Sequence, residues 1–194
     1  LVGSEMCIRD STGTVTVTGT YDVTKLVSIN AGTSGALHLD TRNVALTGTA
    51  ANVKSALAGN FTSNETHTGV VTISDNGTTV NATDITAIET AKGSGNINIT
   101  NAVTLSGTGA KLQSAATALD TIHGSTTAKV TDTSYTVAQL KAINAKVGGA
   151  ITLDNTNVDL VGSADNLVSA LAGTFTAAHT GEVKITGCLL YTSP

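Results

Sequence analysis

The chain has 194 residues, a formal net charge of −4 at pH 7, and charged side chains at 12% of its positions. This mild acidity argues against nucleic acid or an anionic membrane surface as a partner, because both are bound by a basic face. No apolar run approaches the roughly 18 residues of a membrane-spanning helix, so no membrane insertion is expected.

The two ends of the sequence resemble translated sequencing adapter. Residues 1–11 read LVGSEMCIRDS and residues 188–194 read CLLYTSP, which match one frame of a library adapter and its reverse complement. Segments of this kind are set aside before the fold is considered. We therefore expect the biological sequence to run from about Thr12 to Gly187 and to be a metagenomic fragment of a longer protein.

Setting the ends aside changes what the composition implies. Both cysteines, Cys7 and Cys188, lie in the adapter-like ends, so the remainder is expected to have no disulfide framework, thiolate metal site or cysteine nucleophile. The remainder contains 35 threonines, 12 acidic and 9 basic residues, and only four aromatic side chains. A conventional core of this length usually holds more aromatic residues, so the composition favours regular stacking of small aliphatic side chains.

The sequence between these ends repeats itself. Residues 21–62 align without a gap with residues 135–176, with 23 of 42 positions identical, and a diverged copy lies between them. A repeat of this length indicates an array of similar structural units. Modules are predicted at 14–69, 70–127 and 128–182, with a fourth beginning at 183–187.

Each module is predicted to contain two strand-then-helix units. Alternation of apolar and polar residues places every second side chain inward, and seven short segments with an apolar-x-apolar core are predicted to be the strands that begin the units. They are Val15/Val17, Leu37/Leu39, Val71/Ile73, Ile97/Ile99, Ala128/Val130, Ile151/Leu153 and Val183/Ile185. A further short strand is expected before each second helix, at Val44/Leu46, Val103/Leu105 and Val158/Leu160.

Polar residues mark where the helices are expected to begin and end. The N-cap residues, whose side chains accept hydrogen bonds from the first turn, are predicted to be Asp22, Asn81 and Thr136 in the first helices and Thr49, Thr108 and Ser163 in the second. Thr136 and Gln139 have the spacing of a capping box. Gly59 and Gly173 are predicted to follow the second helix as C′ glycines.

Strands separated by short helices favour parallel pairing through crossover connections. The predicted fold class is therefore α/β, as a repeat solenoid with a parallel sheet on one face and short helices on the other. The stability of such an array comes from the interfaces between neighbouring repeats of the same chain. The alternative is a string of small α+β domains, one for each module, because 55 to 58 residues is just enough for a marginal domain.

The histidines and the acidic corners are the candidates for metal binding. His67, His123 and His179 recur shortly before opening strands, but equivalent positions two coils apart would lie roughly 9 to 10 Å from one another, too far to share a zinc ion. We interpret them as polar loop residues, and His38 as an outward strand residue. Oxygen ligands at the corners could hold calcium, although Asx turns are the favoured interpretation; these corners are Asp40, Asn43, Asn101, Asp154 and Asn157.

Enzyme signatures are absent from the sequence. We find no nucleophile elbow, zinc-protease helix, phosphate-binding loop or dinucleotide fingerprint. The segment GTGAK at 107–111 aligns with GTAAN at 48–52, so the repeat accounts for it. We therefore predict no catalytic, cofactor-binding or metal-binding residues and no enzymatic activity.

Two sequence segments resemble those of a known protein family. YTVAQLKAIN at 135–144 and GAITLDNTNVDLVGSADNLVSALAG at 149–173 resemble repeats in giant cell-surface proteins of marine bacteria, of the cyanobacterial, swimming-associated type. The resemblance implies an extracellular, secreted surface array that extends, spaces or adheres, and it brings no ligand residues. The alternatives are a glycan- or protein-binding module that uses the outer sheet face and a passive repeat region within a larger secreted enzyme.

Overall fold

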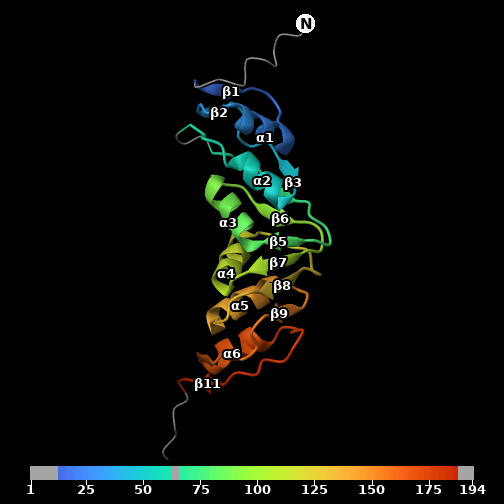
Figure 1. Cartoon of the computed structure of the whole chain (residues 1–194), viewed down its shortest axis with the longest axis vertical. Helices are drawn as coiled ribbons and strands as arrows, with labels where there is room; N and C mark the ends of the chain where they lie inside the picture. Colours follow the sequence, from blue (N-terminus) through green and yellow to red (C-terminus); the bar gives the residue numbers. More distant parts are fainter. Residues whose placement is uncertain (1–12, 63–65, 188–194) are drawn as a thin grey trace, which may run out of the picture. The chain divides into compact units, whose positions relative to one another are not determined.

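The computed structural model describes residues 13–62 and 66–187 (Figure 1). The adapter-like segments 1–11 and 188–194 lie outside the described residues. The chain divides into two compact units that alternate along the sequence. Of the described residues, the first unit comprises 13–62, 66–75, 84–100 and 118–121, and the second comprises 76–83, 101–117 and 122–187.

The first unit contains two parallel sheets. One sheet joins β1 (Val15–Val17) to β2 (Leu37–Leu39), and the other has the strand order β3 (Leu46–Gly48), β4 (Val71–Ile73), β6 (Ile97–Ile99). Two helices belong to this unit throughout, α1 (Val23–Gly32) and α2 (Ala50–Leu57), and most of α3 (Ala82–Ala91) also does. Helices α1 and α2 pack against each other.

The second unit repeats this plan. Its larger sheet has the strand order β5 (Thr79–Asn81), β7 (Thr104–Gly107), β8 (Thr127–Val130), β9 (Ile151–Leu153), and its smaller sheet joins β10 (Leu160–Gly162) to β11 (Val183–Ile185). The helices are most of α4 (Gly109–Ala118), α5 (Val137–Lys146) and α6 (Ala164–Leu171). Figure 1 shows α4 and α5 beside the strands β7, β8 and β9, and α5 packs against α6.

Every pair of named strands in the described residues is parallel. Paired residues lie 22 to 26 positions apart in the sequence, as in Val15 with Leu37 and Val71 with Ile97. Each interval contains a helix, as is usual for a connection between parallel strands. The sequence-based prediction of an α/β class with parallel strands is therefore confirmed.

Strand pairing crosses the predicted module boundaries. β3 of the first module pairs with β4 of the second, and β7 of the second pairs with β8 of the third. The middle copy, in turn, contributes strands to both compact units. This pattern differs from one closed α+β domain for each module, because the sheets are shared between neighbouring copies.

The predicted strands agree well with the observed ones. All seven opening strands are present at the expected residues. The second strands begin one or two residues later than expected, at Leu46, Thr104 and Leu160. Strand β5 was not predicted, because Val80 is its single inward apolar residue and no alternating pattern marks it.

Inward aliphatic side chains form the core between each sheet and its helices. Leu46, Val71 and Ile97 pair with one another across three strands and are fully buried. Leu26, Ile88 and similar residues of the helices are buried in the same way. Each such side chain contributes roughly 1.5 to 3 kcal/mol when it is withdrawn from water, so the stacked rows are the main source of stability.

Most of the predicted helix caps are observed. Asp22 accepts a hydrogen bond from the Lys25 amide at 2.8 Å, and Thr136 and Gln139 form the expected reciprocal capping box. The hydroxyls of Thr49 and Thr108 each accept a bond at 3.3 Å from the amide three residues on. Ser163 is the N-cap residue of α6, as predicted, but its side chain makes no capping hydrogen bond.

Gly59 and Gly173 follow their helices as expected, but for a different reason. Neither has the positive φ of a left-handed C′ glycine. A Cβ atom at Gly59 would overlap the side-chain oxygen of Asn30, and a Cβ at Gly173 would overlap that of Asn144. Glycine is therefore needed where an asparagine from the preceding helix approaches the backbone.

Candidate functional site

Tyr21 and His67 form the most buried polar pair in the described part of the chain. Tyr21 lies just before α1 and His67 lies before β4, and both belong to the first unit. The Tyr21 hydroxyl lies 3.3 Å from His67 Nδ1, and the two rings meet edge to face with centroids 6.3 Å apart. His67 is fully buried and Tyr21 is 4% exposed.

The surroundings of His67 disfavour its protonation. Burial lowers the pKa of His67 from 6.5 to about 4; the backbone of Gly69 opposes this shift, and the positive charge of Lys92 adds to it. Its Nε2 atom has no hydrogen-bond partner among the described residues. Burial also raises the pKa of the Tyr21 hydroxyl. The pair is therefore neutral at pH 7 and is enclosed by the fold.

Lys92 is a buried charged residue whose positive charge acts on His67. Its side chain is only 5% exposed, and its Nζ atom binds the carboxylate of Glu89 at 3.0 Å and the carbonyl oxygen of Gly95. The ammonium group thus has partners that compensate for its burial, as a buried charge requires. These contacts hold the end of α3 and the loop before β6, which is a structural role.

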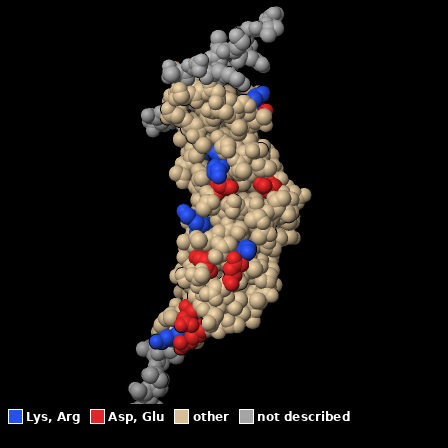
Figure 2. Space-filling view, in the orientation of Figure 1, with Lys and Arg blue, Asp and Glu red and all other residues tan. Residues whose placement is uncertain are grey.

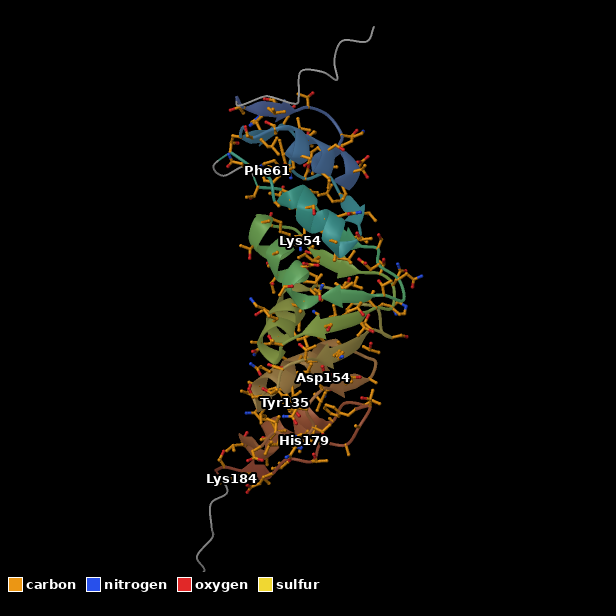
Figure 3. The ribbon with its side chains drawn as sticks, viewed as in Figure 1. Lys54, Phe61, Tyr135, Asp154, His179 and Lys184 are labelled. Carbon is orange, nitrogen blue, oxygen red and sulfur yellow. The ribbon has the colours of Figure 1, made fainter. Side chains whose placement is uncertain are left out.

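The same aromatic–histidine pair recurs in the second unit. Tyr135 occupies the repeat position of Tyr21, and His179 that of His67; their ring centroids lie 6.4 Å apart (Figure 3). His179 is half-buried, and its Nε2 lies 2.7 Å from the carbonyl oxygen of Val158. The Tyr135 hydroxyl donates to the carbonyl oxygen of Asn155 at 2.8 Å. Burial, and secondarily the Asp132 carboxylate, raise the pKa of Tyr135.

The middle copy lacks the pair. Val80 stands at the position of Tyr21 and is buried, while His123, at the position of His67, is exposed. The histidine is therefore fully or half buried where the copy also carries tyrosine, and exposed where it does not. All three histidines lie in loops, as interpreted, but His123 is exposed and His179 is half-buried, whereas His67 is fully buried beside the Tyr21 ring.

The sequence offered one signal for this pairing. The two copies that carry tyrosine before the first helix also carry the HTG phrase, at 67–69 and 179–181. The middle copy has neither the tyrosine nor the full phrase. His38, the other histidine, is a half-buried residue at the middle of β2, as expected of an outward strand position.

The acidic and amide corners make internal contacts. Asp154 forms a surface ion pair with Lys129 at 3.2 Å. Asn155 accepts a bond from the Asn157 amide at 3.0 Å, so the Asx turn is centred on Asn155 and not on the neighbours predicted to form it. Asp40 and Asn43 are exposed in the turn between β2 and β3, and Asn101 is half-buried before β7.

Other carboxylates accept hydrogen bonds from backbone amides that lie 23 to 25 residues away in the sequence. Asp75, after β4, accepts a bond from the first amide of α2 at 2.7 Å, and Asp132, after β8, accepts bonds from the first amide of α4 at 3.0 Å. Asp120 and Asp159 accept backbone bonds in a similar way. Negative charge at a helix N-terminus is favourable, so these acids stabilise the fold.

Within residues 13–62 and 66–187, no three histidine, cysteine, aspartate or glutamate side chains gather as a group that could hold an ion. Within the same ranges, none of the helices has the length and apolar character needed to cross a bilayer. Charged side chains are sparse over the face shown in Figure 2.

A shallow groove of about 570 Å³ lies in the second unit between α5, β10 and the start of α6. Val137, Ala142 and Val161 line it, and Lys141 donates to Asn166 across it at 2.8 Å. The polar side chains that line the groove are those of Thr136, Lys141 and Asn166.

No protein-family model, curated protein or solved structure matches the chain.

Proposed function

We propose that the chain is a structural, adhesive tandem-repeat segment of a large secreted or cell-surface bacterial protein, and that it carries no catalytic activity. Its coils stack as an α/β solenoid, and its principal partners are the neighbouring repeats of the same chain. The observation that carries this proposal is the parallel pairing of strands 22 to 26 residues apart in both units.

Outward polar side chains support a structural role. The hydroxyls of Thr104 and Thr127, on adjacent strands, lie 2.9 Å apart, and those of Thr156 and Thr180 lie 3.2 Å apart. The Thr121 hydroxyl donates to the side-chain oxygen of Asn98 at 2.7 Å. Polar groups that could bind a ligand are thus bonded to their counterparts on the next coil. A glycan- or protein-binding module on the outer sheet face is the alternative.

Extracellular localisation is part of the proposal and rests on the resemblance of residues 135–144 and 149–173 to surface-array repeats. We propose no resident cofactor. Calcium at the corners near Asp40 and Asp154 is the alternative. An unfolding midpoint that rises with calcium and falls again with a chelator would establish the calcium-bound form.

Long-read sequencing of the source DNA across Gly13 and Gly187 tests the function. We expect further in-frame modules on at least one side and a secretion signal in the same reading frame. Modules that end at once beside a hydrolase or protease domain would contradict the proposal. They would show that these repeats are an accessory region of an enzyme.

A further inference from the structure

Three apolar side chains near the last strand of the second unit are exposed. Val168 of α6 is 70% exposed, and Val183 and Ile185 of β11 are 44% and 56% exposed. β11 pairs with β10 and with no other strand of the described chain. A strand edge of this kind presents unpaired backbone groups beside apolar side chains, which is what an added strand requires.

The repeat shows what covers the same positions in the first module. Val71 and Ile73 of β4 align with Val183 and Ile185, and both are fully buried. They are buried because β4 pairs on one edge with β3 and on the other with β6, where Val71 meets Ile97. β10 and β11 reproduce the pairing of β3 with β4, and the counterpart of β6 is the strand that would complete this sheet.

Position 168 distinguishes the two modules. Its counterpart in α2 is Lys54, whose Nζ lies 2.6 Å from the carboxylate of Asp84 on α3. In α6 the same position is Val168, which cannot neutralise a carboxylate. An acidic residue placed against Val168 would lose water without gaining a charged partner, so the covering helix must differ from α3 at this point.

We propose that Val168, Val183 and Ile185 form a docking surface for the next coil of the same repeat, a helix followed by a strand, and that this helix carries no acidic residue where α3 carries Asp84. The proposal rests on the proposed function but concerns a physical interface, so it can fail while the array is real. The junction at Lys54 is then charged and the junction at Val168 is apolar. This difference selects which coil follows each module.

The docking surface is tested by extending the chain. Residues 76–127, which contain α3 and β6, are appended after Gly187 in place of the adapter-like end. We expect amide hydrogen exchange in β11 to slow at least about tenfold, because local opening then requires the added coil to leave. The matched control carries Ile97→Asp and Ile99→Asp in the appended copy only, and it should exchange as fast as the unextended chain.

Two further variants test the chemistry of the junction. With Val168 present, Asp84→Ala in the appended copy should raise the unfolding midpoint by a few degrees, about 3 to 5 °C. With Val168→Lys, Asp84→Ala in the appended copy should instead lower the unfolding midpoint, because Asp84 then has a lysine partner equivalent to Lys54.

Equal exchange in the native and charged extensions would overturn the docking surface. If Asp84→Ala still raises the unfolding midpoint after Val168→Lys, the residue at position 168 does not select the helix that follows. β11 protection that rises with the concentration of the unextended chain would also overturn the proposal, because a second copy would then be the occupant. DNA sequencing across Gly187 tests only whether the chain is part of a repeat array. Failure of the proposed function can therefore be told apart from failure of the docking surface.

Discussion

Tyr21 and His67 come from segments 46 residues apart, and their contact places an imidazole where water is excluded. A buried imidazole is stable when neutral and costly when charged, because the protein interior solvates an ion poorly. The Tyr21 hydroxyl partners Nδ1, while Nε2 has no partner among the described residues. The pair therefore links the stability of the first unit to pH.

We predict that the free energy of unfolding falls as pH decreases from about 6.5 to about 4. Burial lowers the pKa of folded His67 to about 4, so between these values the unfolded chain binds a proton that the folded chain does not. The stabilisation is fully present above pH 6.5 and is lost toward pH 4, to a total of about 3 kcal/mol. Urea unfolding across this range measures the change.

The control for this effect is a histidine outside the core. His67→Gln should flatten the pH dependence, whereas His123→Gln, at an exposed position, should leave it as it is in the parent chain. Identical slopes for the parent chain and His67→Gln would show that burial of His67 does not control acid stability.

An asparagine side chain approaches the backbone at Gly59 and at Gly173. Asn30 donates to the carbonyl oxygens of Ser55 and Ala56 at 3.0 and 2.8 Å, and Asn144 donates to that of Ser169 at 2.8 Å. Gly59→Ala should destabilise the chain by about 1 to 3 kcal/mol, because its Cβ overlaps the Asn30 side chain.

Thermal unfolding of matched variants checks the effect of this contact. Gly124→Ala is the control, because a Cβ at Gly124 meets no atom within 4 Å. We expect that variant to match or slightly exceed the parent in stability, through the lower entropy of its unfolded chain. Equal midpoints for the two alanine variants would contradict the role of the asparagine.

Secondary-structure elements could be predicted where local chemistry determines them. The seven opening strands and the capping box at Thr136 follow from alternation and from side chains that bond within one turn. Strand β5, with Val80 as its one inward residue, depends on pairing with β7, and such tertiary context overrides a weak local pattern. Ser163 has the right identity and position for a cap, but its hydroxyl makes no capping bond.

A helix cap that comes from a residue distant in the sequence could not be predicted from local spacing. Asp132 follows β8, yet it accepts hydrogen bonds from the first amide of α4, 23 residues earlier. No rule of spacing within one helix connects these residues. The charge stabilises α4 because it faces the positive end of the helix dipole and bonds a free amide.

We predict that Asp132→Ala lowers the free energy of unfolding by about 1 to 2 kcal/mol, as the loss of a charged cap does. Ser163→Ala is the matched comparison, because Ser163 precedes α6 and makes no side-chain capping bond. It should change stability by less than about 0.5 kcal/mol. Chemical denaturation of both variants measures the difference, and equal losses would show that Asp132 is not the cap of α4.

At the scale of the whole molecule, the repeat predicted the class of fold but not its pairing scheme. The opening strand β4 pairs with β3, the second strand of the preceding module, and β8 pairs likewise with β7. The sequence identity between copies does not show which edge of a sheet pairs with the next strand. The division of the middle copy between two compact units follows from that choice.

The candidate site could be predicted in part. The histidines at 67, 123 and 179 were recognised as equivalent positions. Their different burial depends on Tyr21 and Tyr135, which lie more than 40 residues away and reach them only through the fold. An isolated repeat alignment cannot supply such contacts, because it compares positions along the chain and not across coils.

Neighbouring modules share their sheets, and the unfolding of isolated modules tests this sharing most directly. Circular dichroism would compare residues 14–69, 70–127 and 128–182, each produced alone, with residues 13–187. We predict that each isolated module lacks a cooperative transition, because strands such as β3 and β7 lose their partners and one repeat cannot offset its own conformational entropy. The full segment should unfold cooperatively. Isolated modules that each unfold at the midpoint of the full segment would contradict the account.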